Sequence, residues 1–275
     1  DFPRVILSRS WIPKAFRKIL SIIFEVFEDF VANKISAVIA ATPHIADRFS
    51  RVNKITVNIN NYPILQEIIL NQKHGNFEKK VCYHGAITSE RGISEMLQAA
   101  KKSDCHLLLA GPVEENVKKK CLEYEQSGHC KYLGIVSRIR VKELMEESFA
   151  GLLIFHPEGN HIKAQPNKMF EYMSAGLPVI ASNFPLWKEI IEGNQCGICV
   201  NPLEPKEIAA AIDWLAQNPE AAEQMGKNGR KAVEEKYNWQ NEEKNLIYLY
   251  IYKKYFCLSN LTNLNINKNK LSALP

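Results

Sequence analysis

The loop of residues 156–168 (HPEGNHIKAQPNK) concentrates side chains that could hold a ligand or move a proton. A loop of this length inside a compact domain is usually functional or mobile. Glu158 and His161 are residue types that serve as acid and base beside a substrate, so they are candidate catalytic residues. His156 and His161 could also indicate a metal, but no carboxylate-rich cluster accompanies them, and we predict no metal site.

A predicted helix follows this loop and carries two charged residues near its start. Asn167 is a candidate N-cap, Lys168 falls in the first turn, and Glu171 lies just beyond. A lysine at a helix start opposes the helix dipole, which is understandable if an anion binds between them. Residues three apart share a helix face, so the Glu171 carboxylate could accept both hydroxyls of a ribose beside a phosphate site. The alternative is a simple ion pair between Lys168 and Glu171.

Two further turns have the composition of ligand-binding turns. In residues 85–92 (GAITSERG), Gly85 permits close approach of a ligand, the following helix start offers N–H groups to an anion, and Arg91 adds a permanent charge. This is neither a Walker loop nor a G-x-G-x-x-G motif, so an ordinary strand–helix turn is the alternative. Gly134 and Val136 follow another strand and could frame a flat slot for a base, although packing alone would explain them equally well.

These turns separate short apolar runs from helical patterns. The expected strands cover residues 37–41, 55–59, 81–84, 106–110, 131–133, 151–155, 179–182 and 198–200. The expected helices cover residues 16–31, 43–50, 93–102, 114–127, 138–148, 168–175, 185–192, 205–217, 219–236 and 241–254. This alternation indicates an α/β fold with a doubly wound parallel sheet. Ligands bind such sheets at the carboxyl ends of the strands, which is where the segments above lie.

Composition narrows the class of protein. The chain has 275 residues, 46% of them hydrophobic and 24% charged, as in an ordinary globular protein. Seven irregularly spaced cysteines without a secretory signal favour reduced thiols and a cytoplasmic location. No apolar run is long enough to span a membrane. Aromatic residues are not interleaved with a basic strip, so we expect no nucleic-acid partner.

The first predicted helix has an apolar face preceded by a basic cluster. Lys14, Arg17 and Lys18 lie near Trp11 at its start, where cations oppose the helix dipole. One interpretation is peripheral contact with an anionic membrane, such as the inner face of the cytoplasmic membrane. Burial against another part of the domain is the alternative, and we favour it.

With these residues in view, the sequence resembles glycosyltransferase family 4, in the form that builds bacterial lipopolysaccharide, capsule or exopolysaccharide. The central stretch is residues 165–182 (QPNKMFEYMSAGLPVIAS), which is specific to the family's donor site. Residues 83–85, 91–93, 108–112, 197–207, 226–230 and 237–239 are similar in order and spacing. The resemblance covers roughly residues 37–255.

The resemblance implies a GT-B fold of two Rossmann-like domains, and a retaining hexosyltransferase that needs no metal or other cofactor. Its donor would be a UDP- or GDP-linked sugar and its acceptor a glycan or a lipid-linked glycan. By residue, Arg91 and Lys168 would neutralise the diphosphate, Glu171 would hold the ribose, and the amide of Asn167 would join the phosphate cradle. The loop of residues 158–164 would contact the donor sugar.

The domain division implied is a remnant of the acceptor-side domain in residues 1–60, a linker in 61–79 and the donor-binding Rossmann-like domain in 80–236. A crossover helix in 237–255 and a disordered tail in 256–275 would follow. Two positions depart from the family: Lys163 stands where a first glutamate is usual, and Ala86 follows Gly85 where an arginine is usual. A non-catalytic nucleotide-sugar-binding fragment, a nucleotide-sugar epimerase and a glycogen-type synthase therefore stay open as alternatives.

Overall fold

A six-stranded parallel sheet forms the centre of the computed structural model, which describes residues 6–7, 12–65, 79–158 and 160–262. The strands run in the order β5-β4-β3-β6-β7-β8, and every neighbouring pair is parallel. Their bounds are β3 Lys80–His84, β4 His106–Ala110, β5 Cys130–Tyr132, β6 Ala150–Leu153, β7 Val179–Ser182 and β8 Gly197–Val200. The predicted α/β class with a doubly wound parallel sheet is confirmed.

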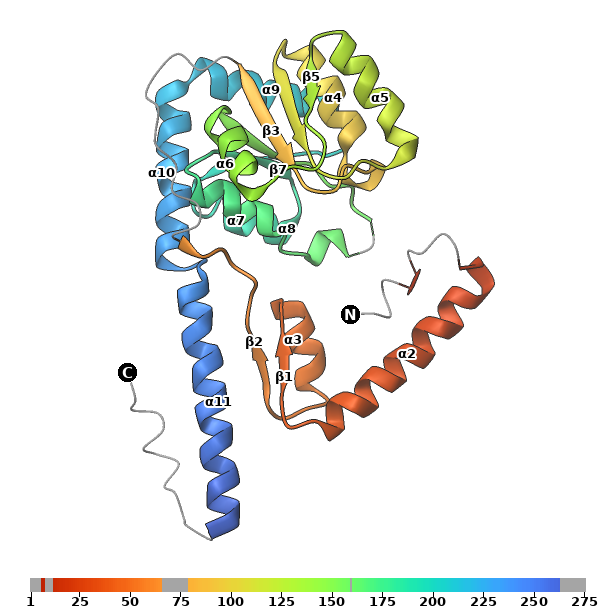
Figure 1. The fold of residues 1–275 in the computed structure, drawn as a ribbon, viewed down its shortest axis with the longest axis vertical. Coiled ribbons are helices and arrows are strands. Elements are labelled where there is room, and N and C mark those ends of the chain that lie inside the picture. Colours follow the sequence, from red (N-terminus) through yellow and green to blue (C-terminus); the bar gives the residue numbers. More distant parts are fainter. Residues whose placement is uncertain (1–5, 8–11, 66–78, 159, 263–275) are drawn as a thin grey trace.

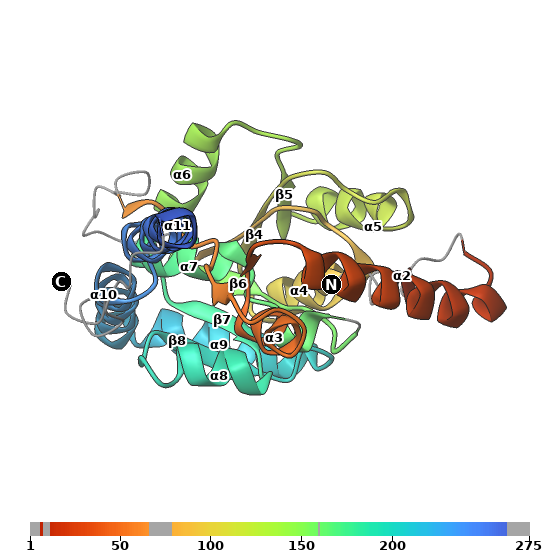
Figure 2. The ribbon, with the colours of Figure 1, turned by 90° about the horizontal axis from the view of Figure 1, so that it is seen from below.

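Helices cover both faces of this sheet (Figures 1 and 2). They are α4 Ile93–Lys102, α5 Glu115–Gln126, α6 Arg138–Glu146, α7 Asn167–Ser174, α8 Pro185–Ile191, α9 Pro205–Gln217 and α10 Pro219–Glu235. Figure 2 shows α4 and α5 on one side of the strands and α6 and α7 on the other. Helix α9 packs against α4, and α10 packs against α7. Right-handed crossovers demand this separation, because the chain winds from β3 outward to β5 and then back past β3 to β8.

Burial explains why these runs form strands. Strands β6 and β7 are buried at every position, and β3 and β4 are buried at every position after the first. A strand covered by helices on both faces needs apolar residues throughout, and that is the pattern in the sequence. Proline at the first position of α8, α9 and α10 sets where those helices begin. The winding direction changes between β3 and β6, which is the place where open α/β sheets bind ligands.

The N-terminal part forms a separate two-stranded parallel sheet, seen at the bottom of Figure 1. Strands β1 (Val38–Ala40) and β2 (Thr56–Asn58) are joined by α3 (Pro43–Ser50), and α2 (Lys14–Lys34) precedes them. Helix α2 turns its polar side to α3, where Arg48 pairs with Glu28 and Asp29. Its apolar side is bare, with seven side chains more than half exposed: Phe16, Ile19, Ile22, Ile23, Val26, Phe27 and Phe30.

Helix α11 (Trp239–Thr262) closes the described chain and meets the end of the N-terminal part. Its buried Glu242 accepts hydrogen bonds from the backbone N–H and the side-chain amide of Asn60, at 3.0 and 3.1 Å. The helix runs to Thr262, past residue 255 where the crossover helix was predicted to end, and the disorder of the tail stays a prediction. A formed helix adds one hydrogen bond per residue, and no glycine or proline interrupts the sequence before Pro275.

Residues 66–78 of the predicted linker, residues 263–275 of the predicted tail and Trp11 lie outside the described residues. Within the described part of the chain, no helix has the length and apolar character needed to cross a bilayer.

Candidate functional site

Two glycines follow strands at the carboxyl edge of the sheet, beside the switch point, which is the place between β3 and β6 where the winding direction changes. Gly85 follows β3 with φ +113°, and Gly111 follows β4 with φ +134°, a region that side-chain-bearing residues rarely adopt. A Cβ atom on Gly85 would lie 2.8 Å from the Lys168 Nζ, and one on Gly111 would collide with the Gly85 carbonyl. Glycine at position 85 therefore leaves room for the Lys168 ammonium group at the end of β3. Glycine at position 111 lets the backbones of residues 85 and 111 approach each other.

Lys168 occupies the space that Gly85 leaves. Its side chain comes from the first turn of α7 and is buried, and its Nζ donates to the Tyr83 hydroxyl at 3.0 Å. The Nζ also lies 4.1 Å from the Tyr83 ring centroid. Burial, and then the charge of Arg91, lower the pKa of Lys168 to about 7. A lysine that is half protonated near neutral pH, without a carboxylate bonded to it, is poised to gain a proton when an anion arrives.

The ring of Phe155 lies close to two cationic side chains and to one imidazole of the site. It lies 5.4 Å from the Arg91 guanidinium carbon, 5.3 Å from the Lys168 Nζ and 4.9 Å from the ring of His161. A cation over an aromatic face is stabilised by the ring quadrupole. Phe155 thus holds two cations and an imidazole around one point just beyond the end of β6.

Glu171 sits one turn along α7 and pairs with Arg138 instead of Lys168. Its Oε1 accepts from the Arg138 Nη1 at 3.1 Å, and its Oε2 lies 3.4 Å from the His84 Nε2. Burial, and then the charges of Lys168 and Arg138, lower the pKa of His84 to about 3, so the imidazole is neutral and the longer contact is not an ion pair. The alternative of a direct Lys168–Glu171 ion pair is wrong, because the Lys168 Nζ bonds to the Tyr83 hydroxyl. The charge of Glu171 raises the pKa of Lys168, but by less than burial and Arg91 lower it.

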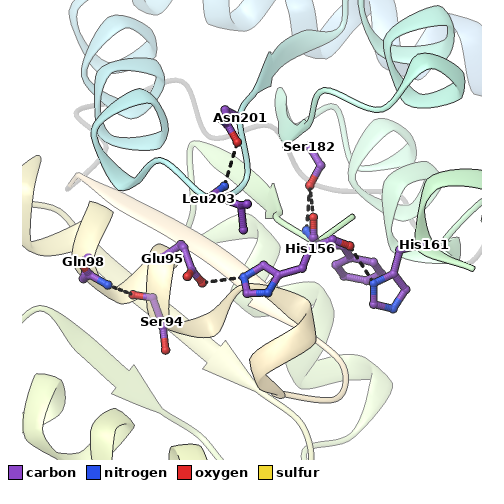
Figure 3. A network of polar contacts seen from close by, with 9 residues as sticks. Ser94, Glu95, Gln98, His156, His161, Ser182, Asn201 and Leu203 are labelled. Atoms are coloured by element: carbon purple, nitrogen blue, oxygen red, sulfur yellow. Dashed lines mark hydrogen bonds and ion pairs between the residues drawn. The ribbon is translucent and has the colours of Figure 1, made fainter. Parts of the chain in front are cut away.

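Hydrogen bonds hold both ends of the loop after β6, and Figure 3 shows those at its start. The His156 Nε2 lies 3.0 Å from Glu95 Oε2 on α4, and the Ser182 hydroxyl on β7 bonds both the N–H and the carbonyl of Phe155. At the other end, the Trp187 indole N–H donates to the Ala164 carbonyl at 2.7 Å. Such anchoring fixes the start and the end of the loop that connects β6 to α7.

The structure brings some of the predicted site residues together and leaves others apart. Lys168, Arg91, Gly85 and His161 surround the ends of β3 and β6, with Glu171 beside them on α7. The His161 Nδ1 contacts the His156 carbonyl at 3.1 Å. Glu158 is exposed, and among the described residues its carboxylate has no hydrogen-bond or ion-pair partner.

The predicted capping role of Asn167 is wrong. Pro166 is the N-cap, no side chain caps the helix, and Asn167 is the first helical residue, so its backbone N–H stays open at the helix start. Gly134 is placed near this edge, because its carbonyl accepts from the Gly111 N–H at 2.7 Å, and there is open space around its Cα. Val136 packs against the core, whereas its neighbour Ile135 is 80% exposed.

Three residues of the site were not singled out from the sequence. Tyr83 bonds to Lys168 and Phe155 lies close to it. In the sequence, however, both have the pattern of ordinary apolar strand residues. Arg138 begins α6 and lies 33 positions from Glu171, so only the order of strands in the sheet could have paired them. The one available signal was the placement of Tyr83 and Phe155 at the carboxyl ends of neighbouring central strands.

Comparison with known proteins places this site in a family. The sequence profile described as "Glycosyl transferases group 1" matches residues 66–232, which contain all of the candidate site. The chain belongs to this family. The chain's structural neighbours are GT-B glycosyltransferases, and the parallel sheet found here is a Rossmann-like part of that fold.

Individual relatives agree with this membership. The chain is 28% identical over 181 residues to an uncharacterised glycosyltransferase of Methanocaldococcus jannaschii, an alignment covering 63% of this chain and 45% of that protein. It is 24% identical over 247 residues to the capsular polysaccharide biosynthesis glycosyltransferase CapM of Staphylococcus aureus, covering 82% and 63%. The chain thus spans less than two thirds of these relatives.

Solved structures of similar shape include a sucrose-phosphate synthase from Thermosynechococcus elongatus, with a TM-score of 0.70, 20% identity and coverage of 93% of this chain and 66% of that one. Anabaena HepE in complex with UDP and glucose has a TM-score of 0.64 and 16% identity, covering 81% and 65%. At these identities the likeness concerns the fold alone.

Proposed function

We propose that this chain supplies the donor-binding part of a retaining glycosyltransferase that uses a nucleoside-diphosphate sugar. The sugar passes to a glycan or lipid-linked acceptor in the synthesis of a bacterial surface polysaccharide. Membership of the glycosyltransferase family and the likeness to a capsular polysaccharide enzyme support the class of reaction. The residues of this chain support the donor.

One observation carries the assignment of the donor. Two cations, Lys168 and Arg91, meet at the switch point of the sheet around Phe155, and no carboxylate of the described residues pairs with either. Burying an ammonium group costs free energy unless a counter-ion compensates it. A diphosphate bound at the open N–H groups of α7 would supply that compensation.

The chemistry of sugar transfer uses these groups directly. When the bond between the anomeric carbon and the diphosphate oxygen breaks, the electron pair and the developing charge go to the diphosphate. Lys168 and Arg91 would meet that charge, and fixed cations in a water-poor site are effective in this role. The acceptor hydroxyl forms the new bond to the anomeric carbon and releases its proton. His161, which flanks Phe155, and Glu158 are the candidate groups on the sugar side.

Glu171 is proposed to recognise the nucleoside. Its carboxylate lies on the same helix as Lys168, one turn farther from the diphosphate, where the two hydroxyls of a ribose could donate to it. A uracil or guanine would then lie toward the end of β5, beside Gly134 and the exposed side chain of Ile135.

Calorimetry tests this donor site. The purified chain is titrated with UDP, GDP and ADP, and one of them is expected to bind in the micromolar range. Lys168→Met, which keeps the length of the side chain and removes its charge, should weaken that binding roughly 10- to 100-fold. Lys188→Met is the matched control, because Lys188 is an exposed lysine that pairs with Glu192 on α8, and it should bind as the wild type does.

The outcome that contradicts the proposal is a folded chain that binds none of the three nucleotides. Equal binding by Lys168→Met and the wild type would contradict the assignment of the diphosphate to this lysine.

Contact of α2 with an anionic membrane is a separate proposal about a partner. Lys14, Arg17 and Lys18 would face the headgroups and the bare apolar side would enter the interface. In the structure, however, the Arg17 Nε donates to the Ile12 carbonyl at 2.7 Å, so this cation is already engaged by the protein. We therefore favour cover of this side of α2 by protein.

A further inference from the structure

The carboxylate proposed to bind the ribose already has a partner within the protein. Arg138, the first residue of α6, reaches across to α7 and donates from its Nη1 to the Glu171 Oε1 at 3.1 Å. The side chain of Glu171 is only 13% exposed, whereas that of Arg138 is 73% exposed. The carboxylate is thus fixed in the protein wall, and the guanidinium approaches it from the side of the solvent.

The second oxygen of Glu171 has no cation on it. Its Oε2 faces the His84 Nε2 at 3.4 Å, and this imidazole is held neutral by burial. Lys168, although it lies one turn away, bonds to Tyr83. A carboxylate that is largely withdrawn from water needs a partner, and among the described residues Arg138 is the cation that bonds to it.

A ribose bound to Glu171 would need the same oxygen. Two vicinal hydroxyls donate to the two oxygens of one carboxylate, and the accessible one of these carries Arg138. Most of the Arg138 side chain is exposed, and a guanidinium is well solvated in water, so giving up its contact with Glu171 is inexpensive. Ribose and guanidinium therefore compete for one site, and a ligand without the hydroxyls does not take part in the competition.

We propose that Arg138 is a specificity-determining residue that shields Glu171 until the ribose of the incoming nucleotide displaces it. This inference rests on the proposed donor function. Its consequence is that Arg138 reduces the preference of the site for a ribose over a deoxyribose, because part of the ribose–Glu171 free energy is spent on displacing the guanidinium.

The test compares two ligands on each of five proteins. UDP and 2′,3′-dideoxy-UDP, or the matching pair for whichever base binds, are titrated into the wild type, Arg138→Met, Glu171→Gln, the double variant of these two, and Arg140→Met. The measured quantity is the ratio of the dissociation constant of the dideoxy ligand to that of UDP. The loss of positive charge near the diphosphate affects both ligands alike and cancels in this ratio.

The ratio is expected to rise roughly two- to fivefold in Arg138→Met, the range of an exposed ion pair. Glu171→Gln should bring it close to one, and the double variant should match Glu171→Gln, because Arg138 acts only through that carboxylate. Arg140→Met is the control: Arg140 lies on the same helix but pairs with Glu143 and Glu147, and its ratio should equal that of the wild type.

Three outcomes would overturn the inference. An unchanged ratio in Arg138→Met, with a ratio near one in Glu171→Gln, leaves the donor site standing and removes the role of Arg138. A lower ratio in Arg138→Met would mean that the guanidinium itself binds a ribose hydroxyl. A folded wild-type chain that binds no nucleotide would overturn the donor function together with this inference.

Discussion

At the scale of single residues, the charged groups of the site differ in whether a group of opposite charge is bonded to them. Glu171 has Arg138, whereas Lys168 has the Tyr83 hydroxyl and a neighbouring like charge in Arg91. This arrangement costs stability in the empty chain, because a buried ammonium group is poorly solvated. Strain of this kind is common where a protein binds a ligand of opposite charge.

The lowered pKa of Lys168 predicts proton uptake on donor binding. In the free chain this pKa is about 7, and a bound diphosphate raises it by stabilising the ammonium form. Affinity should therefore be flat below pH 7 and fall by up to tenfold per pH unit above it, until the pKa of the complex is reached. A nucleotide sugar such as UDP-glucose is the suitable probe, because the terminal phosphate of UDP itself titrates near pH 6.

Calorimetry at pH 8 in buffers of different ionisation enthalpy measures this uptake, which should approach one proton per nucleotide sugar. Lys168→Met should show none and should lose the pH slope. Wild-type binding without proton uptake at pH 8 would show that Lys168 is already charged before the ligand arrives.

The lowered pKa of Lys168 also predicts how the stability of the fold depends on pH. This dependence distinguishes a loss of binding from misfolding. An unfolded lysine titrates near pH 10.4, so between pH 7 and pH 10 the unfolded chain holds a proton that the folded chain lacks. The cost of burying Lys168 is therefore largest below pH 7 and shrinks as the pH rises. Lys168→Met should accordingly unfold at a higher temperature than the wild type at pH 6 while it binds nucleotide more weakly.

At the scale of elements, the sequence predicted helices and strands well, and it did so where one physical cause dominates. Strand β4 and helices α3, α4 and α9 begin and end at the predicted residues. Central strands are apolar throughout because helices cover both faces, and proline marks the first turn of several helices. The helix of residues 239–262 was predicted too short, because neither glycine nor proline marks its end.

The sequence alone did not predict which helices and strands contact each other. Helix periodicity placed Lys168 and Glu171 on one face of α7 and suggested that they pair, but the order of strands brings Arg138 and His84 to Glu171 instead. Such pairings depend on which strands are neighbours, and an alternating pattern is compatible with many sheet orders. The site could thus be predicted as a set of segments but not as a set of contacts.

The bare side of α2 predicts association in solution. A contiguous apolar surface of this kind marks a contact with another molecule or a tendency to aggregate. Replacing Phe16, Phe27 and Phe30 together by Gln should shift the chain toward a monomer in size-exclusion chromatography with light scattering. Nucleotide affinity should stay at the wild-type value, because α2 lies far from the ends of β3 and β6 (Figure 1).

Flotation with phosphatidylserine vesicles distinguishes the kind of partner that α2 has. Since Arg17 is bonded to the Ile12 carbonyl, we expect the wild type to remain unbound. Flotation of the wild type that is lost when Lys14, Arg17 and Lys18 are replaced by Ala would establish membrane contact and contradict this expectation.

At the scale of the whole molecule, residues 60–63 join the N-terminal part to the six-stranded sheet. Tyr62 packs edge-on against Phe170 of α7, with ring centroids 4.7 Å apart, and the Trp239 N–H donates to the Pro63 carbonyl at 3.0 Å. Glu242 completes the junction by accepting two hydrogen bonds from Asn60. Residues 60–63 and the start of α11 are thus fixed to α7, the helix that carries Lys168 and Glu171.

This junction predicts that the two parts can be loosened without loss of the donor site. Glu242→Ala leaves the buried N–H groups of Asn60 without an acceptor, at a cost of about 1–3 kcal/mol. Limited proteolysis should then cut the chain at residues 60–63 faster in Glu242→Ala than in the wild type. Nucleotide affinity should hold, because Lys168, Arg91 and Glu171 take their positions from the six-stranded sheet and its helices. Glu243→Ala, at the exposed neighbouring position, is the matched control and should change neither quantity. Equal losses of protease resistance and nucleotide affinity in Glu242→Ala would mean instead that the junction holds α7 in place, and that donor binding depends on both parts of the chain.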